Sequence, residues 1–203
     1  MDNAPVPSRL RRVCVFCGSR SGAREIYTRE AARFGRVLAA RGIGIVYGGS
    51  QVGVMGAVAN AALEAGGEVI GVIPHGLADK EVAHHGLTEL RTVETMHERK
   101  AMMADLADAF VALPGGCGTF DELFEVITWA QIGLHAKAIG VLDVEGYFQP
   151  LRALVASVVK EGFASPEHMA LLAFDDDPER LADAIAVPRA FPLGPKWISD
   201  RER

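Results

Sequence analysis

The sequence predicts an α/β protein in which a central parallel β-sheet is flanked by helices, giving three layers. Two patterns predict this fold: short apolar runs alternate with longer segments of helical period, and the runs end at turn-forming residues. The chain of 203 residues, 49% of them hydrophobic, is long enough to bury a core without a disulfide or a metal. We expect one domain at residues 13–187, between a flexible N-terminal segment at 1–12 and a C-terminal tail at 188–203.

The apolar runs are the predicted strands, and each is followed along the chain by a predicted helix. The strands are residues 13–17, 44–47, 68–73, 109–113 and 138–142, and the helices are residues 25–40, 53–65, 95–107, 119–131, 147–160 and 177–186. Three of the strands end at glycine turns, which are Gly18-Ser19, Gly48-Gly49 and Pro114-Gly115-Gly116. Because right-handed crossovers bring the carboxyl ends of parallel strands to one edge of the sheet, we expect these turns to converge.

The charge balance argues against large anionic partners. The chain has 21 Lys and Arg residues against 26 Asp and Glu residues, a formal charge of −5. We therefore expect no nucleic-acid partner and no membrane partner, and an anionic ligand would have to be held locally. No apolar run approaches the roughly 20 residues that span a bilayer, and the first residues lack the apolar stretch of a secretion signal. The expected compartment is the cytoplasm.

The three cysteines do not form the pattern of a metal site. Cys14 and Cys17 make a C-x-x-C pair within an apolar run, and no second pair completes a zinc site. Core packing is favoured over redox or metal chemistry, and we expect no metal.

The strongest local signal is the segment 113–122, where a strand end passes through three glycines directly into a helix. Glycines let the backbone approach a ligand closely, and the free N–H groups at a helix start attract a phosphate. The alternative is a capping box formed by Thr119 and Glu122. The P-loop motif is absent, and the third glycine of the dinucleotide motif is replaced by Asp121.

Arg99 and Glu122 are the candidate charged groups of the site. Arg99 shares a helical stripe with Met96 and Met103, so we expect it to face a ligand or Glu122; the alternative is an arginine that reaches solvent at the helix end. Glu122 lies on a helix that is apolar almost all round, which indicates enclosure within the subunit or a dimer contact. A carboxylate there suits a catalytic acid, base or charge stabiliser.

Two segments together resemble the paired signatures of the LONELY GUY family, the cytokinin riboside 5′-monophosphate phosphoribohydrolases. They are Met-His-Glu-Arg-Lys at 96–100 and Pro-Gly-Gly-Cys-Gly-Thr-Phe-Asp-Glu at 114–122. The resemblance extends in order through most of residues 13–173, including 16–19, 46–49, 71–74 and 125–135. Ser50 and Cys117 depart from the residues frequent in the family, which bears on substrate preference.

The resemblance implies a Rossmann-like subunit, usually a homodimer, that binds a small-molecule substrate. It would hydrolyse the N-glycosidic bond of AMP or N6-prenylated AMP to release the base and ribose 5-phosphate, with no cofactor and no metal. By matching positions, Arg99 and Glu122 would be the catalytic pair. The implied substrate-binding residues, besides these two, are Gly18, Ser19, Gly48, Gly49, Glu81, Met96, Lys100, Gly115, Gly116, Cys117, Gly118, Thr119 and Thr128.

Three other functions compete with this interpretation. A nucleotide or molybdenum-cofactor carrier of the same fold would need the glycine turn but not Arg99 with Glu122. A lysine decarboxylase, a label that some relatives have carried, would need pyridoxal phosphate on a lysine, and no lysine is placed for it. A DNA-processing protein is disfavoured by the acidic charge balance.

Overall fold

A computed structural model describes residues 10–78 and 83–187 of the chain. The predicted tail at 188–203 and residues 1–9 of the predicted N-terminal segment lie outside the described residues. Within the described ranges, seven strands form one parallel sheet in the order β4-β3-β2-β1-β5-β6-β7. The predicted α/β fold with a central parallel sheet is confirmed.

The five interior strands match the predicted apolar runs, and the two edge strands were not predicted. The strands are β1 (Arg12–Phe16), β2 (Gly44–Tyr47), β3 (Val69–Pro74), β4 (Glu89–Val93), β5 (Ala109–Ala112), β6 (Ala138–Leu142) and β7 (Leu172–Asp175). The edge strands β4 and β7 have the sequences Glu-Leu-Arg-Thr-Val and Leu-Ala-Phe-Asp, and both are partly exposed. Since an edge strand is only half covered, it lacks the continuous apolar run that marks an interior parallel strand.

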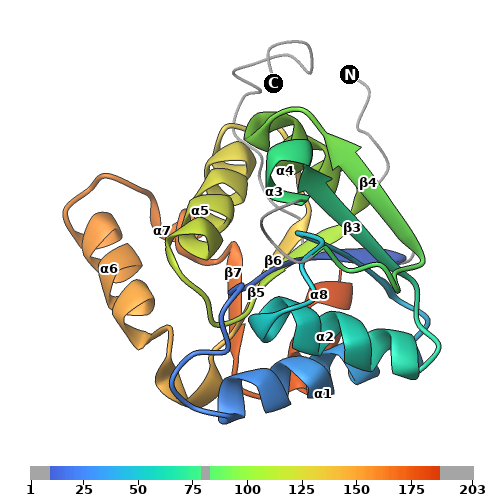
Figure 1. The fold of residues 1–203 in the computed structure, drawn as a ribbon. Coiled ribbons are helices and arrows are strands. Elements are labelled where there is room, and N and C mark those ends of the chain that lie inside the picture. The colour runs from blue at the N-terminus through green and yellow to red at the C-terminus, as the bar shows by residue number, and fades with distance from the viewer. Residues whose placement is uncertain (1–9, 79–82, 188–203) are drawn as a thin grey trace.

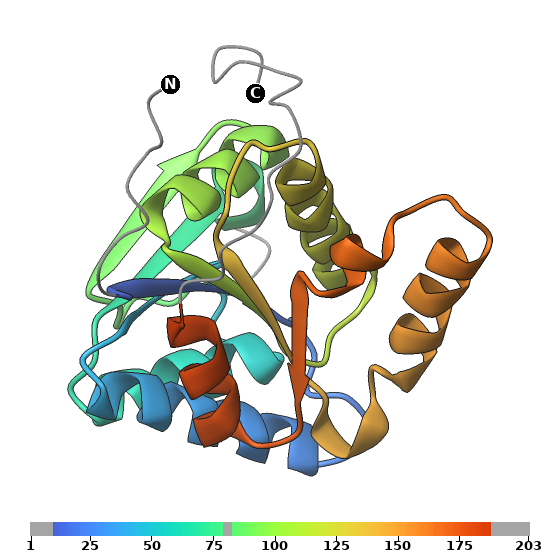
Figure 2. The same cartoon turned by 180° about the vertical axis from the view of Figure 1, so that it is seen from behind.

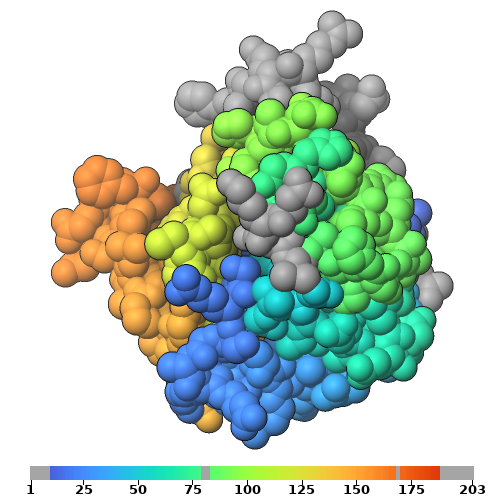
Figure 3. Space-filling view, in the orientation of Figure 1, coloured from blue at the N-terminus to red at the C-terminus, as the bar shows by residue number. Residues whose placement is uncertain are grey.

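The six predicted helices are present, and in the ranges 10–78 and 83–187 three short helical segments lie between them. They are α1 (Ile26–Ala40), α2 (Gly53–Glu64), α4 (Met96–Leu106), α5 (Cys117–Gln131), α6 (Gln149–Lys160) and α8 (Pro178–Ala186); the short segments are α3 (His75–Ala78), η1 (Val144–Gly146) and α7 (Pro166–Met169). Helices α1, α2 and α8 cover one face of the sheet, and α4 and α5 cover the other (Figures 1 and 2). Helix α6 projects from the body of the molecule (Figure 3).

Alternate residues of the segment 13–17, which runs from β1 to the residue after it, contribute to the two cores. Val13, Val15 and Cys17 face the layer of α1, α2 and α8, whereas Cys14 and Phe16 face the layer of α4 and α5. Cys14 and Cys17 are therefore buried on opposite faces of the sheet, and burial raises the pKa of both thiols well above its ordinary value. The prediction that this C-x-x-C pair packs in the core is confirmed.

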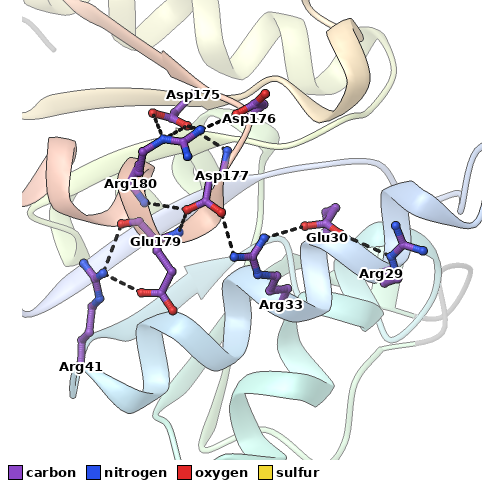
Figure 4. Close-up of polar contacts among 9 residues, drawn as sticks. All are labelled: Arg29, Glu30, Arg33, Arg41, Asp175, Asp176, Asp177, Glu179 and Arg180. Atoms are coloured by element: carbon purple, nitrogen blue, oxygen red, sulfur yellow. Dashed lines mark hydrogen bonds and ion pairs between the residues drawn. The ribbon is translucent and has the colours of Figure 1, made fainter.

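Ion pairs fasten α8 to α1 on the outer side of this layer (Figure 4). Arg33 contacts Asp177 at 2.8 Å, and Arg41 contacts Glu179 at 2.8 Å and Asp183 at 2.7 Å. Asp177 also caps α8 by accepting from the N–H groups of Glu179 and Arg180. Exposed pairs contribute little individually, so the cap is the larger contribution to α8. Among the described residues, no helix is both long and apolar enough to cross a membrane.

Candidate active site

A cleft of about 540 Å³ opens at the carboxyl edge of the sheet, between the turns that follow β1 and β5. Helix α1 leaves β1 toward one face and α5 leaves β5 toward the other, so the cleft lies at the switch point where α/β proteins bind ligands. The two turns touch, because the N–H of Gly18 donates to the carbonyl of Pro114 at 3.1 Å. A Cβ on Gly18 would lie 3.1 Å from the Cα of Gly115. The expected convergence of these two glycine turns is confirmed.

The glycine turn after β5 presents free backbone amides. Helix α5 begins at Cys117, with Gly116 as its N-cap, and the first N–H of the helix with a backbone acceptor belongs to Phe120, which donates to Gly116 at 3.2 Å. Among the described residues, the N–H groups of residues 116–119 have no acceptor. No heavy atom lies within 4 Å of a Cβ built on Gly116 or Gly118, so the backbone there is open. Free amides at a helix start are groups to which an anion can bind.

The alternative capping box at Thr119 and Glu122 is wrong. The helix begins two residues earlier than predicted, so Thr119 lies inside its first turn. The N-cap residue is Gly116, which has no side chain that could accept a hydrogen bond. A capping box exists instead at α4, where Thr95 accepts from the N–H of Glu98 at 3.1 Å and Glu98 accepts from the N–H of Thr95 at 3.2 Å. This box fixes the start of the helix that carries Arg99.

Arg99 and Glu122 face each other in the floor of the cleft. Arg99 Nη2 lies 3.8 Å from Glu122 Oε1, and each side chain is 7% exposed. The guanidinium is anchored from the sheet, because its Nε donates to the carbonyl of Val72 at 3.1 Å. Gly48 lies against the same guanidinium, where a Cβ would overlap Nη2. The expectation that Arg99 faces Glu122 is confirmed, and the alternative of an arginine reaching solvent is wrong.

Burial sets the proton affinity of Glu122. Loss of solvent raises the pKa of this carboxyl to about 7, while the charge of Arg99 acts in the opposite direction. A carboxyl of this kind exchanges its proton near neutral pH and can serve as an acid, a base or a charged stabiliser. The cleft therefore brings a turn with free amides together with a carboxyl that exchanges its proton near neutral pH.

The remaining predicted binding residues divide into two groups. Ser19, Met96 and the 114–119 segment line the cleft, as do Gly18, Arg99 and Glu122. Four predicted residues of the described ranges do not line it, namely Gly48, Gly49, Lys100 and Thr128. Gly48 lies against Arg99, and Gly49 lies close to Ile73 and Leu90. Lys100 pairs with Asp121 and Glu125, and the hydroxyl of Thr128 donates to the carbonyl of Phe124. Glu81 lies outside the described residues.

Part of the cleft wall comes from residues that the sequence did not point to. Tyr27 at the start of α1, Tyr147 in the loop after β6, and Val54 and Met55 of α2 also line the cleft. Tyr147 was predicted only as a helix residue. Its position a few residues after a strand end was the available signal, since strand ends of this sheet meet at the cleft.

Comparison with known proteins adds sequence relatives and structural neighbours. Residues 55–185 match a family described as "Possible lysine decarboxylase". A probable cytokinin riboside 5′-monophosphate phosphoribohydrolase of Oryza sativa subsp. japonica is 52% identical over 91% of this chain and 82% of its own length. A cytokinin riboside 5′-monophosphate phosphoribohydrolase of Arabidopsis thaliana is 50% identical over 79% of this chain and 71% of its own length.

The solved structures with a similar fold are more distant in sequence. The molybdenum cofactor carrier protein of Chlamydomonas reinhardtii superposes with a TM-score of 0.65 at 20% identity, over 86% of this chain and 95% of that one. A molybdenum cofactor binding protein of Rippkaea orientalis gives a TM-score of 0.64 at 20% identity, over 86% and 94% of the two chains. At this identity the likeness shows the shared fold alone.

Proposed function

Since this chain belongs to the cytokinin riboside 5′-monophosphate phosphoribohydrolase family, we propose that it hydrolyses the N-glycosidic bond of N6-prenylated AMP and of AMP. The products are the free base and ribose 5-phosphate. The observation that carries the proposal is the buried pair of Arg99 and Glu122 beside four unpaired amides, because a protein that only holds a nucleotide needs the amides and not the carboxylate.

The proposed mechanism begins with the phosphate on the amides of residues 116–119. Glu122 follows Thr119 by three residues, so its carboxylate lies about one helical turn further along α5 and faces the sugar. Breaking the glycosidic bond passes through an oxocarbenium-like state in which positive charge develops on the ribose. The carboxylate stabilises that charge or activates the attacking water, and the anchored phosphate holds the anomeric carbon beside it.

Arg99 acts in this mechanism mainly through Glu122. Its guanidinium lies beside the carboxylate, with Nη2 3.8 Å from Oε1, and its Nε donates to the carbonyl of Val72. The positive charge of Arg99 lowers the pKa of Glu122 and so opposes the rise that burial causes. Part of the Glu122 population is therefore ionised at neutral pH.

The described residues do not fit a pyridoxal phosphate enzyme. That cofactor supplies an electron sink through a Schiff base with a lysine, and no lysine of residues 10–78 or 83–187 lines the cleft. Lys100 is held by Asp121 at 3.2 Å and Glu125 at 3.0 Å, and Lys137 donates to the carbonyl of Ala104 at 2.7 Å.

Product analysis tests the proposed reaction. Purified protein incubated with AMP, or with its N6-isopentenyl derivative, is expected to release adenine or isopentenyladenine together with ribose 5-phosphate, without added metal. Chromatography of the mixture detects both products. Intact nucleotide after long incubation at high protein concentration, with binding still measurable, would instead identify a carrier.

The value of kcat/KM for AMP is expected to decrease as the pH falls through about 7, the pKa to which burial raises the carboxyl of Glu122. Below that pH the carboxyl is protonated and loses the charge that stabilises the ribose. The second proton of AMP titrates lower, at about pH 6, so the two steps are distinguishable. A profile of kcat/KM from pH 5 to 9 measures this dependence, because it reports the groups of the free enzyme. A flat profile between pH 6 and 8 contradicts the ionised role.

We further propose that the protein is a cytoplasmic homodimer. The side of α5 turned away from the core exposes Phe124, and Met96, the first residue of α4 and part of the cleft lining, is also exposed. An exposed aromatic side chain on an otherwise packed helix suits a two-fold contact, the commonest symmetry of soluble oligomers. The unpaired thiol of Cys117 suits a reducing compartment. Light scattering at working concentration distinguishes a dimer from a monomer.

A further inference from the structure

Tyr147 contacts the glycine turn but has no role in the mechanism proposed above. This residue lies between η1 and α6, and its hydroxyl donates to the carbonyl of Gly115 at 2.5 Å. The ring packs edge-on against Tyr27 at a centroid distance of 5.5 Å and against Phe148 at 5.0 Å. The hydroxyl therefore reaches the turn from a wall of packed aromatic rings.

The loop that carries Tyr147 is itself held in place. The buried carboxylate of Asp143, at the end of β6, accepts from the N–H of Phe148 at 2.6 Å and from the side-chain amide of Gln149 at 2.5 Å. Glu145 adopts a left-handed backbone conformation with φ of 46° and forms an ion pair with Arg24. A residue other than glycine rarely adopts this conformation, so contacts with the surrounding residues must hold the loop in place. Tyr147 is a fixed donor.

The geometry of the peptide bond connects this donor to the anion site. The carbonyl of Gly115 and the N–H of Gly116 belong to one planar trans peptide, so they point in opposite directions. The N–H of Gly116 is the first of the four unpaired amides at residues 116–119. Glycines flank this peptide on both sides, so the backbone dihedral angles next to it are less restricted than they would be between other residues. A hydrogen bond that holds the carbonyl therefore also fixes the direction of the amide.

We propose that Tyr147 is a positioning residue that orients the Gly115–Gly116 peptide for phosphate binding. The inference rests on the proposed role of the turn and deepens it, because it assigns part of the affinity for phosphate to a side chain 32 residues from Gly115 along the chain. Without the hydroxyl, the peptide can rotate and one of the four donors no longer points at the phosphate. The base and the sugar, which do not contact this amide in the proposed mechanism, are unaffected.

The test is Tyr147→Phe, which removes the hydroxyl and keeps the packed ring. Binding of ribose 5-phosphate is expected to weaken about fivefold to tenfold, the usual effect of one hydrogen bond, and KM for AMP is expected to rise by a similar factor. The kcat is expected to change by less than about twofold, since Glu122 is untouched. Inhibition by adenosine, which has the base and sugar without the phosphate, is expected to be unchanged.

The matched control is Tyr47→Phe. Its hydroxyl donates to the carbonyl of Ser50 at 3.1 Å, so the variant loses a buried hydrogen bond of the same type outside the cleft lining. The two variants are expected to melt at similar temperatures, with ribose 5-phosphate binding weakened only in Tyr147→Phe. If the parent protein binds no ribose 5-phosphate, the proposed function of the turn fails. If the parent binds ribose 5-phosphate and Tyr147→Phe binds it equally well, the positioning role is overturned. The same holds if inhibition by adenosine weakens in Tyr147→Phe by as large a factor as ribose 5-phosphate binding.

Discussion

Glu122→Gln is expected to lower kcat for AMP and for N6-prenylated AMP at least about 100-fold, the effect typical of losing one charge-stabilising group. The amide keeps the size and most of the packing of the buried side chain but carries no charge to oppose the positive charge on the ribose. Glu122→Ala is expected to show the same loss. Initial rates with saturating nucleotide measure the change in kcat.

A stability measurement distinguishes loss of chemistry from loss of fold. Burial raises the pKa of Glu122 from its ordinary value near 4.5 to about 7, so the unfolded chain releases this proton more readily than the folded one. The folded state is therefore destabilised by Glu122 as the pH rises from about 4.5 to 7, and the cost is constant above that range. Glu122→Gln removes the cost and is expected to melt at a higher temperature than the parent at pH 8.

Glu125→Gln is the matched control for Glu122→Gln. Glu125 lies on the same helix but pairs with Lys100 at 3.0 Å and does not line the cleft. Its kcat is expected to stay within about twofold of the parent. If Glu122→Gln is as active as this control, Glu122 has no part in the reaction.

Arg99→Ala is expected to lower kcat by at least about 100-fold and also to move the acidic limb of the pH profile upward. Arg99 is the main group that lowers the pKa of Glu122, so its removal leaves burial unopposed and raises that pKa further. More of the carboxyl is then protonated at neutral pH. The pH dependence of kcat/KM for parent and variant measures both effects.

Arg99→Lys separates charge from geometry in this prediction. A lysine keeps a positive charge in the same space but loses the planar group that contacts both Glu122 and the carbonyl of Val72. Its pH midpoint is expected to stay near that of the parent while kcat falls. A midpoint that is the same in Arg99→Ala and the parent contradicts the influence of Arg99 on Glu122.

The interior of the fold was predictable from the sequence because its strands are covered on both faces. Such strands need apolar side chains at every position, and this is the pattern at residues 13–17 and 109–113. The edge strands β4 and β7 follow a different rule. Glu89 and Arg91 form an ion pair on the surface of β4, so this strand has charged residues where an interior strand has apolar ones. Its place in the sheet depends on backbone pairing with β3, which a hydropathy pattern does not reveal.

Part of the site was predictable for a similar physical reason. A charged residue in an apolar helical stripe is costly without a partner, and this cost pointed to Arg99 and Glu122 as neighbours. The role of Gly48 was not predictable in this way, because its lack of a side chain makes room for a guanidinium that arrives from a distant helix. Tyr147 was missed because its contact with Gly115 depends on how β5 and β6 pair, which local sequence does not specify.

A crystal structure of Glu122→Gln with AMP bound tests the proposed mechanism most directly, since this variant is expected to hold the substrate without cleaving it. The phosphate is expected to accept hydrogen bonds from the amides of residues 116–119, and the side chain at 122 is expected to face the anomeric carbon of the ribose. A side chain at 122 that points away from the ribose, with the nucleotide otherwise bound in the cleft, would contradict the proposed mechanism.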